Sequence, residues 1–68
     1  MSNDYAISKL TSALNMLSDL ETRTFEHWDN LGRSDAPYHQ RQAASVIHDE
    51  VTRIGNRVKA ALKSLVED

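Results

Sequence analysis

The stretch Gly32-Arg33-Ser34-Asp35-Ala36-Pro37 is the clearest break in the sequence, because it holds one of the two glycines and the only proline. Glycine and proline are the residues that most strongly interrupt regular structure. The sequence has no internal repeat, low-complexity stretch or linker. The break therefore divides the 68 residues into two nearly equal arms of a single domain, residues 1–68.

Apolar residues of the first arm recur at intervals of three and four, the spacing of one face of an α-helix. They are Ile7, Leu10, Leu14, Leu17, Trp28 and Leu31. The middle of the arm interrupts this pattern with Glu21 and Thr24. A straight helix drifts against a seven-residue repeat, so we expect the apolar stripe to rotate there toward Leu20 and Phe25.

Both ends of this first helix carry residues suited to helix termini. Ser2 or Asn3 can cap its start, and Gly32 is placed to end it in a left-handed conformation. We therefore expect a helix over about 4–31 and a loop over about 32–36.

The second arm has a more regular apolar stripe, with unbroken three–four spacing. Its members are Ala44, Ile47, Val51, Ile54, Val58, Ala61 and Leu65. Ala43, Leu62 and Val66 widen it. The phase continues through Gly55, whereas a turn would reset it, so we expect one helix over about 37–66. Gly55 either admits a close neighbour or is simply tolerated.

Charged residues support the helical interpretation of both arms. Oppositely charged residues four apart lie one turn apart on a helix and stabilise it by a few tenths of a kcal/mol. The sequence holds four such pairs, which are Asp19–Arg23, Asp29–Arg33, Asp49–Arg53 and Lys63–Glu67.

Two long helices joined by a short loop predict an all-α fold, an antiparallel helical hairpin. The apolar stripes are wider than one thin hairpin can enclose, and the chain has no Cys for a disulfide. Small domains without a disulfide or a metal usually need oligomerisation. We therefore expect two hairpins to pair as a homodimer, a four-helix bundle.

Two short stretches resemble the Rop family of small plasmid RNA-binding proteins, which are dimers of helical hairpins. Ser12-Ala13-Leu14-Asn15-Met16 is similar to part of the first helix of that family, and His48-Asp49 to a pair in the second. The strip of the first helix that contacts RNA in that family corresponds here to Ser8, Asn15, Asp19, Arg23 and Asn30. Asp19 stands where the family has an essential Phe, and its carboxylate would repel phosphate. The resemblance therefore implies the architecture and not the activity.

Composition argues against catalysis and metal binding. Without Cys there is no thiolate nucleophile or thiolate ligand, and no glycine-rich phosphate loop is present. Metal sites in helical bundles need Glu-x-x-His or two His four residues apart, and His27, His39 and His48 have neither spacing. We expect a protein that is not an enzyme and needs no cofactor.

The N-terminal residues are acidic and polar, and no apolar run approaches the ~20 residues that cross a bilayer. We therefore expect a cytoplasmic protein with no membrane partner.

The turn-proximal ends of the two arms concentrate unusual residues. Three of the four aromatic residues and two of the three His lie there. The candidate partner-binding residues are Phe25, Trp28, Arg33, Tyr38, His39 and Arg41. Aromatic and Arg side chains are enriched at protein-interface hot spots, and they also stack on bases or hold anions. The cluster is thus a protein-binding surface, a site for a small anionic or nucleotide ligand, or simply the closed end of the bundle.

A second candidate surface is basic. Residues 51–63 carry four positive charges and no acid, namely Arg53, Arg57, Lys59 and Lys63. Such residues either form a solvated face or contact phosphate with release of counterions. The net charge of the whole chain, −2, does not favour a strongly basic nucleic-acid binder.

We expect a small non-enzymatic interaction protein, a homodimeric hairpin that binds and regulates, inhibits or chaperones another protein. Hairpins of this class are similar to phage-encoded inhibitors of host proteins and to type III secretion co-chaperones. The alternatives are a Rop-like RNA-binding regulator that uses the basic residues of the second helix, and sequestration of a small nucleotide at the turn.

Overall fold

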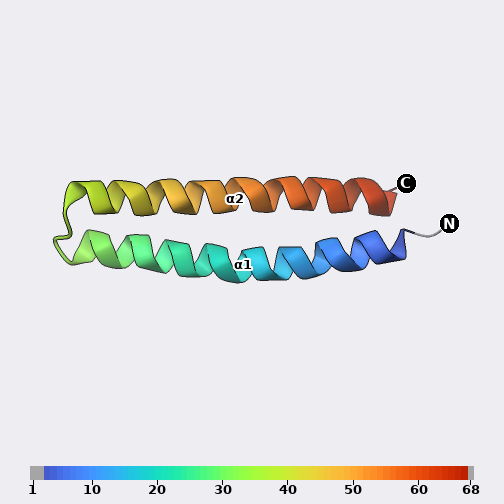
Figure 1. The fold of residues 1–68 in the computed structure, drawn as a ribbon, viewed down its shortest axis with the longest axis horizontal. Coiled ribbons are helices and arrows are strands. Elements are labelled where there is room, and N and C mark those ends of the chain that lie inside the picture. The colour runs from blue at the N-terminus through green and yellow to red at the C-terminus, as the bar shows by residue number, and fades with distance from the viewer. Residues whose placement is uncertain (1–2, 68) are drawn as a thin grey trace.

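The computed structural model describes residues 3–67 and consists of two antiparallel helices (Figure 1). Helix α1 spans Asp4–Arg33 and helix α2 spans Tyr38–Glu67, each of 30 residues. The helices lie side by side along their whole length, so that α1 begins and α2 ends at the edge opposite the turn (Figure 1). The hairpin measures 54 × 14 × 12 Å between Cα atoms. The prediction of an all-α helical hairpin is confirmed.

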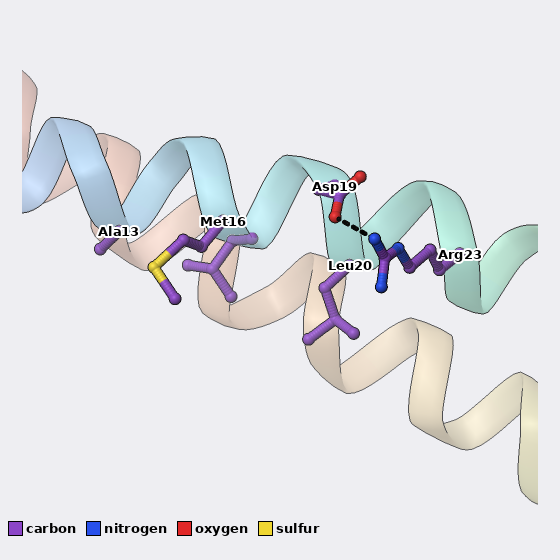
Figure 2. Close-up of a pocket in the computed structure, with 6 residues that line it drawn as sticks. Ala13, Met16, Asp19, Leu20 and Arg23 are labelled. Atoms are coloured by element: carbon purple, nitrogen blue, oxygen red, sulfur yellow. Dashed lines mark ion pairs between the residues drawn. The ribbon is translucent and has the colours of Figure 1, made fainter.

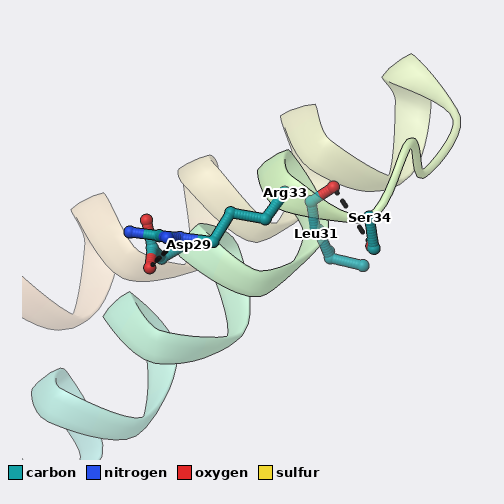
Figure 3. A network of polar contacts seen from close by, with 4 residues as sticks. All are labelled: Asp29, Leu31, Arg33 and Ser34. Carbon is teal, nitrogen blue, oxygen red and sulfur yellow. Dashed lines mark hydrogen bonds and ion pairs between the residues drawn. The ribbon is translucent and has the colours of Figure 1, made fainter.

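The expected helix stop at Gly32 is wrong. No glycine of the described chain has a positive φ, and α1 continues to Arg33. The left-handed residue is Asp35 instead, with φ of 57°. Asp is one of the few side chains that tolerate this conformation. Two contacts stabilise the last turn of α1 (Figure 3). The Arg33 side chain folds back onto Asp29, and the Ser34 hydroxyl donates to the Leu31 carbonyl oxygen.

The start of α1 is not capped by a side chain in the expected way. Asn3 occupies the cap position of α1 without a side-chain hydrogen bond, and Ser2 lies outside the described residues. At α2 the Pro37 carbonyl oxygen accepts the Arg41 amide at 3.2 Å. Pro37 therefore immediately precedes α2, where its missing N–H leaves no hydrogen bond unmade.

The seam along which α1 meets α2 does not rotate in its middle, contrary to our expectation. Glu21 and Thr24 are half-buried in the seam, whereas Leu20 and Phe25 lie beside it and remain 44% and 47% exposed. The seam residues are Ile7, Leu10, Leu14, Leu17, Glu21, Thr24, Trp28 and Leu31. A continuous three–four spacing thus holds over the whole of α1, at the cost of two polar residues between the helices.

The seam of α2 also differs from the predicted stripe. The residues that enter it are Ala44, His48, Val51, Gly55, Val58, Leu62 and Leu65, and Ser45 and Thr52 beside it are half-buried as well. Ile47, Ile54 and Ala61 lie on one flank of this seam and stay exposed. The apolar stripe is wider than one neighbouring helix can cover, so part of it is left outside the contact. The helix continues unbroken through Gly55, as predicted.

The core of the single hairpin is thin. Among the described residues only Ala44, 3% exposed, and Val51, 9% exposed, are buried apolar side chains. A typical core residue is surrounded by six or more neighbours, which two helices alone cannot supply.

Three of the four predicted ion pairs form within the helices. Asp19–Arg23, Asp29–Arg33 and Lys63–Glu67 lie at 3.2, 3.0 and 3.8 Å. The expected Asp49–Arg53 pair is wrong, because Arg53 pairs with Glu50 at 3.3 Å. All these pairs are exposed, so they contribute little to stability.

Candidate functional site

The hairpin brings most of the predicted turn-end residues onto one surface. Trp28 lies near the end of α1, and Tyr38 and Arg41 lie in the first turn of α2. Trp28, Tyr38 and Arg41 line one shallow hollow, and Trp28, Arg33 and Arg41 line a second beside it. Trp28 and Arg41 are shared by both hollows, so the four residues form one continuous patch. We call Trp28, Arg33, Tyr38 and Arg41 the turn surface.

Phe25 lines neither hollow of the turn surface. Its ring lies 5.7 Å from the His48 ring and 5.8 Å from the Trp28 ring, both in tilted geometry. Such tilted pairs are favoured by the aromatic quadrupole. Phe25 therefore packs against the Trp28 ring and is not part of the turn surface.

The two arginines of the turn surface differ in their surroundings. The Arg33 Nε donates to Asp29 Oδ2 at 3.0 Å (Figure 3). Arg41 is exposed and has no carboxylate partner among the described residues, so its guanidinium is open to a ligand. His39 is exposed and lines neither hollow.

A polar hollow lies farther along the hairpin, on the flank that carries Phe25. It is lined by Ser18, Glu21, Thr22, Phe25, His48 and Lys59. The Thr24 hydroxyl donates its one hydrogen to the Glu21 carbonyl oxygen at 3.0 Å. The 2.9 Å contact between Thr24 Oγ1 and His48 Nδ1 is then one in which Nδ1–H donates. This bond joins the two helices and was not foreseen, because its partners lie 24 residues apart.

An apolar groove runs along the opposite flank of α1. Ala13, Met16, Leu17 and Leu20 line it together with Asp19 and Arg23. Figure 2 shows Met16 and Leu20 projecting into the groove, with the Asp19–Arg23 ion pair at its end. Met16 is 73% exposed. The sequence pattern did not single out Met16, because it lies outside the three–four spacing of the seam.

The four basic residues of α2 do not act as a set of free charges. Arg53 and Lys63 are paired with Glu50 and Glu67. Lys59 lines the polar hollow, and Arg57 is exposed. Their spacing also distributes them around the helix rather than along one line.

Comparisons with known proteins found no match for this chain. No protein-family model matches the chain, and no curated protein or solved structure is significantly similar to it. Within residues 3–67 no group of three or more His, Cys, Asp or Glu is placed to hold a metal ion. Neither described helix is long and apolar enough to cross a bilayer.

Proposed function

We propose that the chain is a non-enzymatic interaction protein, a homodimeric helical hairpin that binds another protein through its turn surface. The observation that carries this proposal is an exposed aromatic pair flanked by an Arg without an internal partner. Trp28 and Tyr38 are 40% and 69% exposed. Arg41 lines both of the shallow hollows beside Trp28, and Tyr38 lines one of them.

This combination suits recognition of a protein surface. Trp, Tyr and Arg are enriched at interface hot spots, and Trp and Tyr bury a large area while losing few rotamers. The Arg41 guanidinium can donate two parallel hydrogen bonds to a carboxylate of the partner. The shallow hollows beside Trp28 are typical of a contact site and unlike the deep, enclosed pockets that hold small ligands.

The opposite end of the hairpin supplies a matched control. Lys9 Nζ lies 5.5 Å from the Tyr5 ring centre, and Tyr5 is 76% exposed. Tyr5 and Lys9 are thus also an exposed aromatic residue with a nearby cation, near the start of α1. This pair therefore controls for the loss of an exposed aromatic ring and a nearby positive charge away from the turn.

The test compares Tyr38→Ala with Arg41→Ala against Tyr5→Ala with Lys9→Ala. Affinity capture from the native host with quantitative mass spectrometry identifies the partner, and titration with the purified partner gives Kd. We expect the first double variant to raise Kd at least tenfold, which corresponds to about 1.4 kcal/mol. The control should leave Kd unchanged, and both should retain the helical circular dichroism of the native chain.

An equal loss of affinity in both double variants would contradict the proposal. So would unchanged binding in the first variant together with loss of binding in Arg53→Glu with Arg57→Glu. In that case, steep weakening of the native chain's binding by salt would indicate a nucleic-acid partner.

A further inference from the structure

The hairpin leaves an apolar flank uncovered, on the side away from the polar hollow. Ser18 and Phe25 of α1 share the polar hollow with Lys59 of α2, so these residues lie on one flank. By helical spacing, residues on the far side of the seam then share the other flank. We call these residues the apolar flank, and they are Ala13, Leu20, Ile47, Ile54 and Ala61.

The exposed area of the chain indicates how much of it a partner must cover. The hairpin exposes 5369 Å², about 1,000 Å² more than the ~4,300 Å² expected of a compact protein of 7.7 kDa. A stable interface buries roughly 800 Å² per partner. The excess therefore matches the burial of one face of the hairpin against a second molecule.

The residues of the apolar flank change in size along the hairpin. The Thr24–His48 hydrogen bond shows that these two residues lie at the same level of the hairpin. Leu20 consequently lies near the level of Ile54, and Ala13 lies near the level of Ala61. The level of Leu20 and Ile54 is also close to the midpoint of both helices. Large side chains thus stand at the centre, small ones toward the chain ends, and Ile47 toward the turn.

We propose that a second copy of this chain covers the apolar flank with its turn at the opposite end of the bundle. This inference rests on the dimer of the proposed function. It adds which face of the hairpin forms the contact and how the two hairpins are oriented relative to each other. A two-fold axis at the level of Leu20 and Ile54 overlaps the two hairpins along their whole length. It places α2 on α2 of the second copy, so that Ile47 of each chain lies over Ala61 of the other.

The opposite direction, with both turns at one end, packs less well. It places α1 on α2 of the second copy and gathers Ala13 and Ala61 of both chains in one layer. Four small side chains in a layer leave a void, and voids cost stability. The proposed direction instead places Ile47 over Ala61 on both sides of the axis, and it keeps the large Leu20 and Ile54 of both chains together at the centre.

The face is tested with neighbouring residues of equal exposure. Ile47 and Val46 are both 54% exposed, and only Ile47 belongs to the apolar flank. We expect Ile47→Asp to raise the Kd of the dimer at least tenfold in sedimentation equilibrium, and Val46→Asp to leave it within twofold. Circular dichroism at a concentration above the dimer Kd checks that both variants are helical. Equal effects of the two variants would overturn the assignment of the face.

The direction is tested by cross-linking, which the chain suits because the described residues include no cysteine. Equimolar Ile47→Cys and Ala61→Cys chains, unfolded and refolded together and then oxidised, should form a disulfide-linked heterodimer. An equimolar mixture of Ala13→Cys and Ala61→Cys should not, because the proposed arrangement separates these positions by about 21 Å along the axis.

Cross-linking in the second mixture alone would overturn the direction. Cross-linking in neither, in chains that sediment as dimers, would overturn the face and leave the dimer of the proposed function standing. A native chain that sediments as a monomer at every concentration would remove that dimer as well.

Discussion

At the scale of single residues, Gly55 shows how little the two helices fill the space between them. Gly55 is buried in the seam, yet a Cβ built on it meets no atom within 4 Å. Of the two interpretations of this glycine, a close neighbour or simple tolerance, the hairpin favours tolerance. A glycine inside a helix costs about 1 kcal/mol relative to Ala.

Gly55→Ala should therefore stabilise the protein by up to about 1 kcal/mol and raise Tm by roughly 4–8 °C. Differential scanning calorimetry measures the change. Gly32→Ala is the matched control, because a Cβ there also meets no atom within 4 Å. Its gain should be smaller, since Gly32 lies in the last turn of α1, where fewer intrahelical hydrogen bonds form. A lower Tm for Gly55→Ala alone would mean that a neighbouring group occupies the space beside Gly55.

At the scale of the helices, the sequence predicted where each one runs more reliably than how the two meet. Three–four spacing is a property of one helix, so the arms could be recognised from local pattern alone. The second arm, however, contains two overlapping three–four series. Both include Ala44, Val51, Val58 and Leu65. One adds Ile47 and the other His48, and hydropathy favours the wrong one.

The choice between the two series depends on a contact across the hairpin. His48 enters the seam, where it donates to Thr24 Oγ1, and this pairing is invisible to a pattern within one arm. The turn surface was easier to predict, because any hairpin brings together the residues that flank its turn. The orientation of Phe25 toward His48 could not be predicted, since it follows from the seam.

Thr24→Val tests what this cross-helix bond contributes. Valine keeps the shape and removes the acceptor, leaving the His48 Nδ1–H without its partner. We expect a loss of about 1 kcal/mol in the free energy of unfolding, measured by urea denaturation. Thr22→Val is the control, because the Thr22 hydroxyl bonds only the Ser18 carbonyl oxygen within its own helix. Its effect should stay within about 0.5 kcal/mol.

Replacing both partners should reverse the loss. Thr24→Val with His48→Leu substitutes an apolar contact for the hydrogen bond, which is close to neutral or stabilising. If Thr24→Val behaves like Thr22→Val, apolar packing alone sets the register between α1 and α2.

At the scale of the whole molecule, we expect the chain to be stably folded only as a dimer. A hairpin in which only two apolar side chains are buried within residues 3–67 cannot offset the conformational entropy lost on folding. Covering the apolar flank supplies the missing burial. Folding and dimerisation should then occur in a single transition, as in obligate dimers without a stable monomer.

The melting temperature should consequently depend on protein concentration. Raising the concentration from 1 to 100 µM favours a folded dimer by about 2.7 kcal/mol. With an unfolding entropy of about 2.1 cal/mol/K per residue over two chains, Tm should rise by on the order of 10 °C. Light scattering at the higher concentration should give twice the chain mass of 7.7 kDa. An identical Tm at both concentrations, with the mass of one chain, would mean that the thin hairpin is stable alone. The exposed Leu20, Ile47 and Ile54 would then need another explanation.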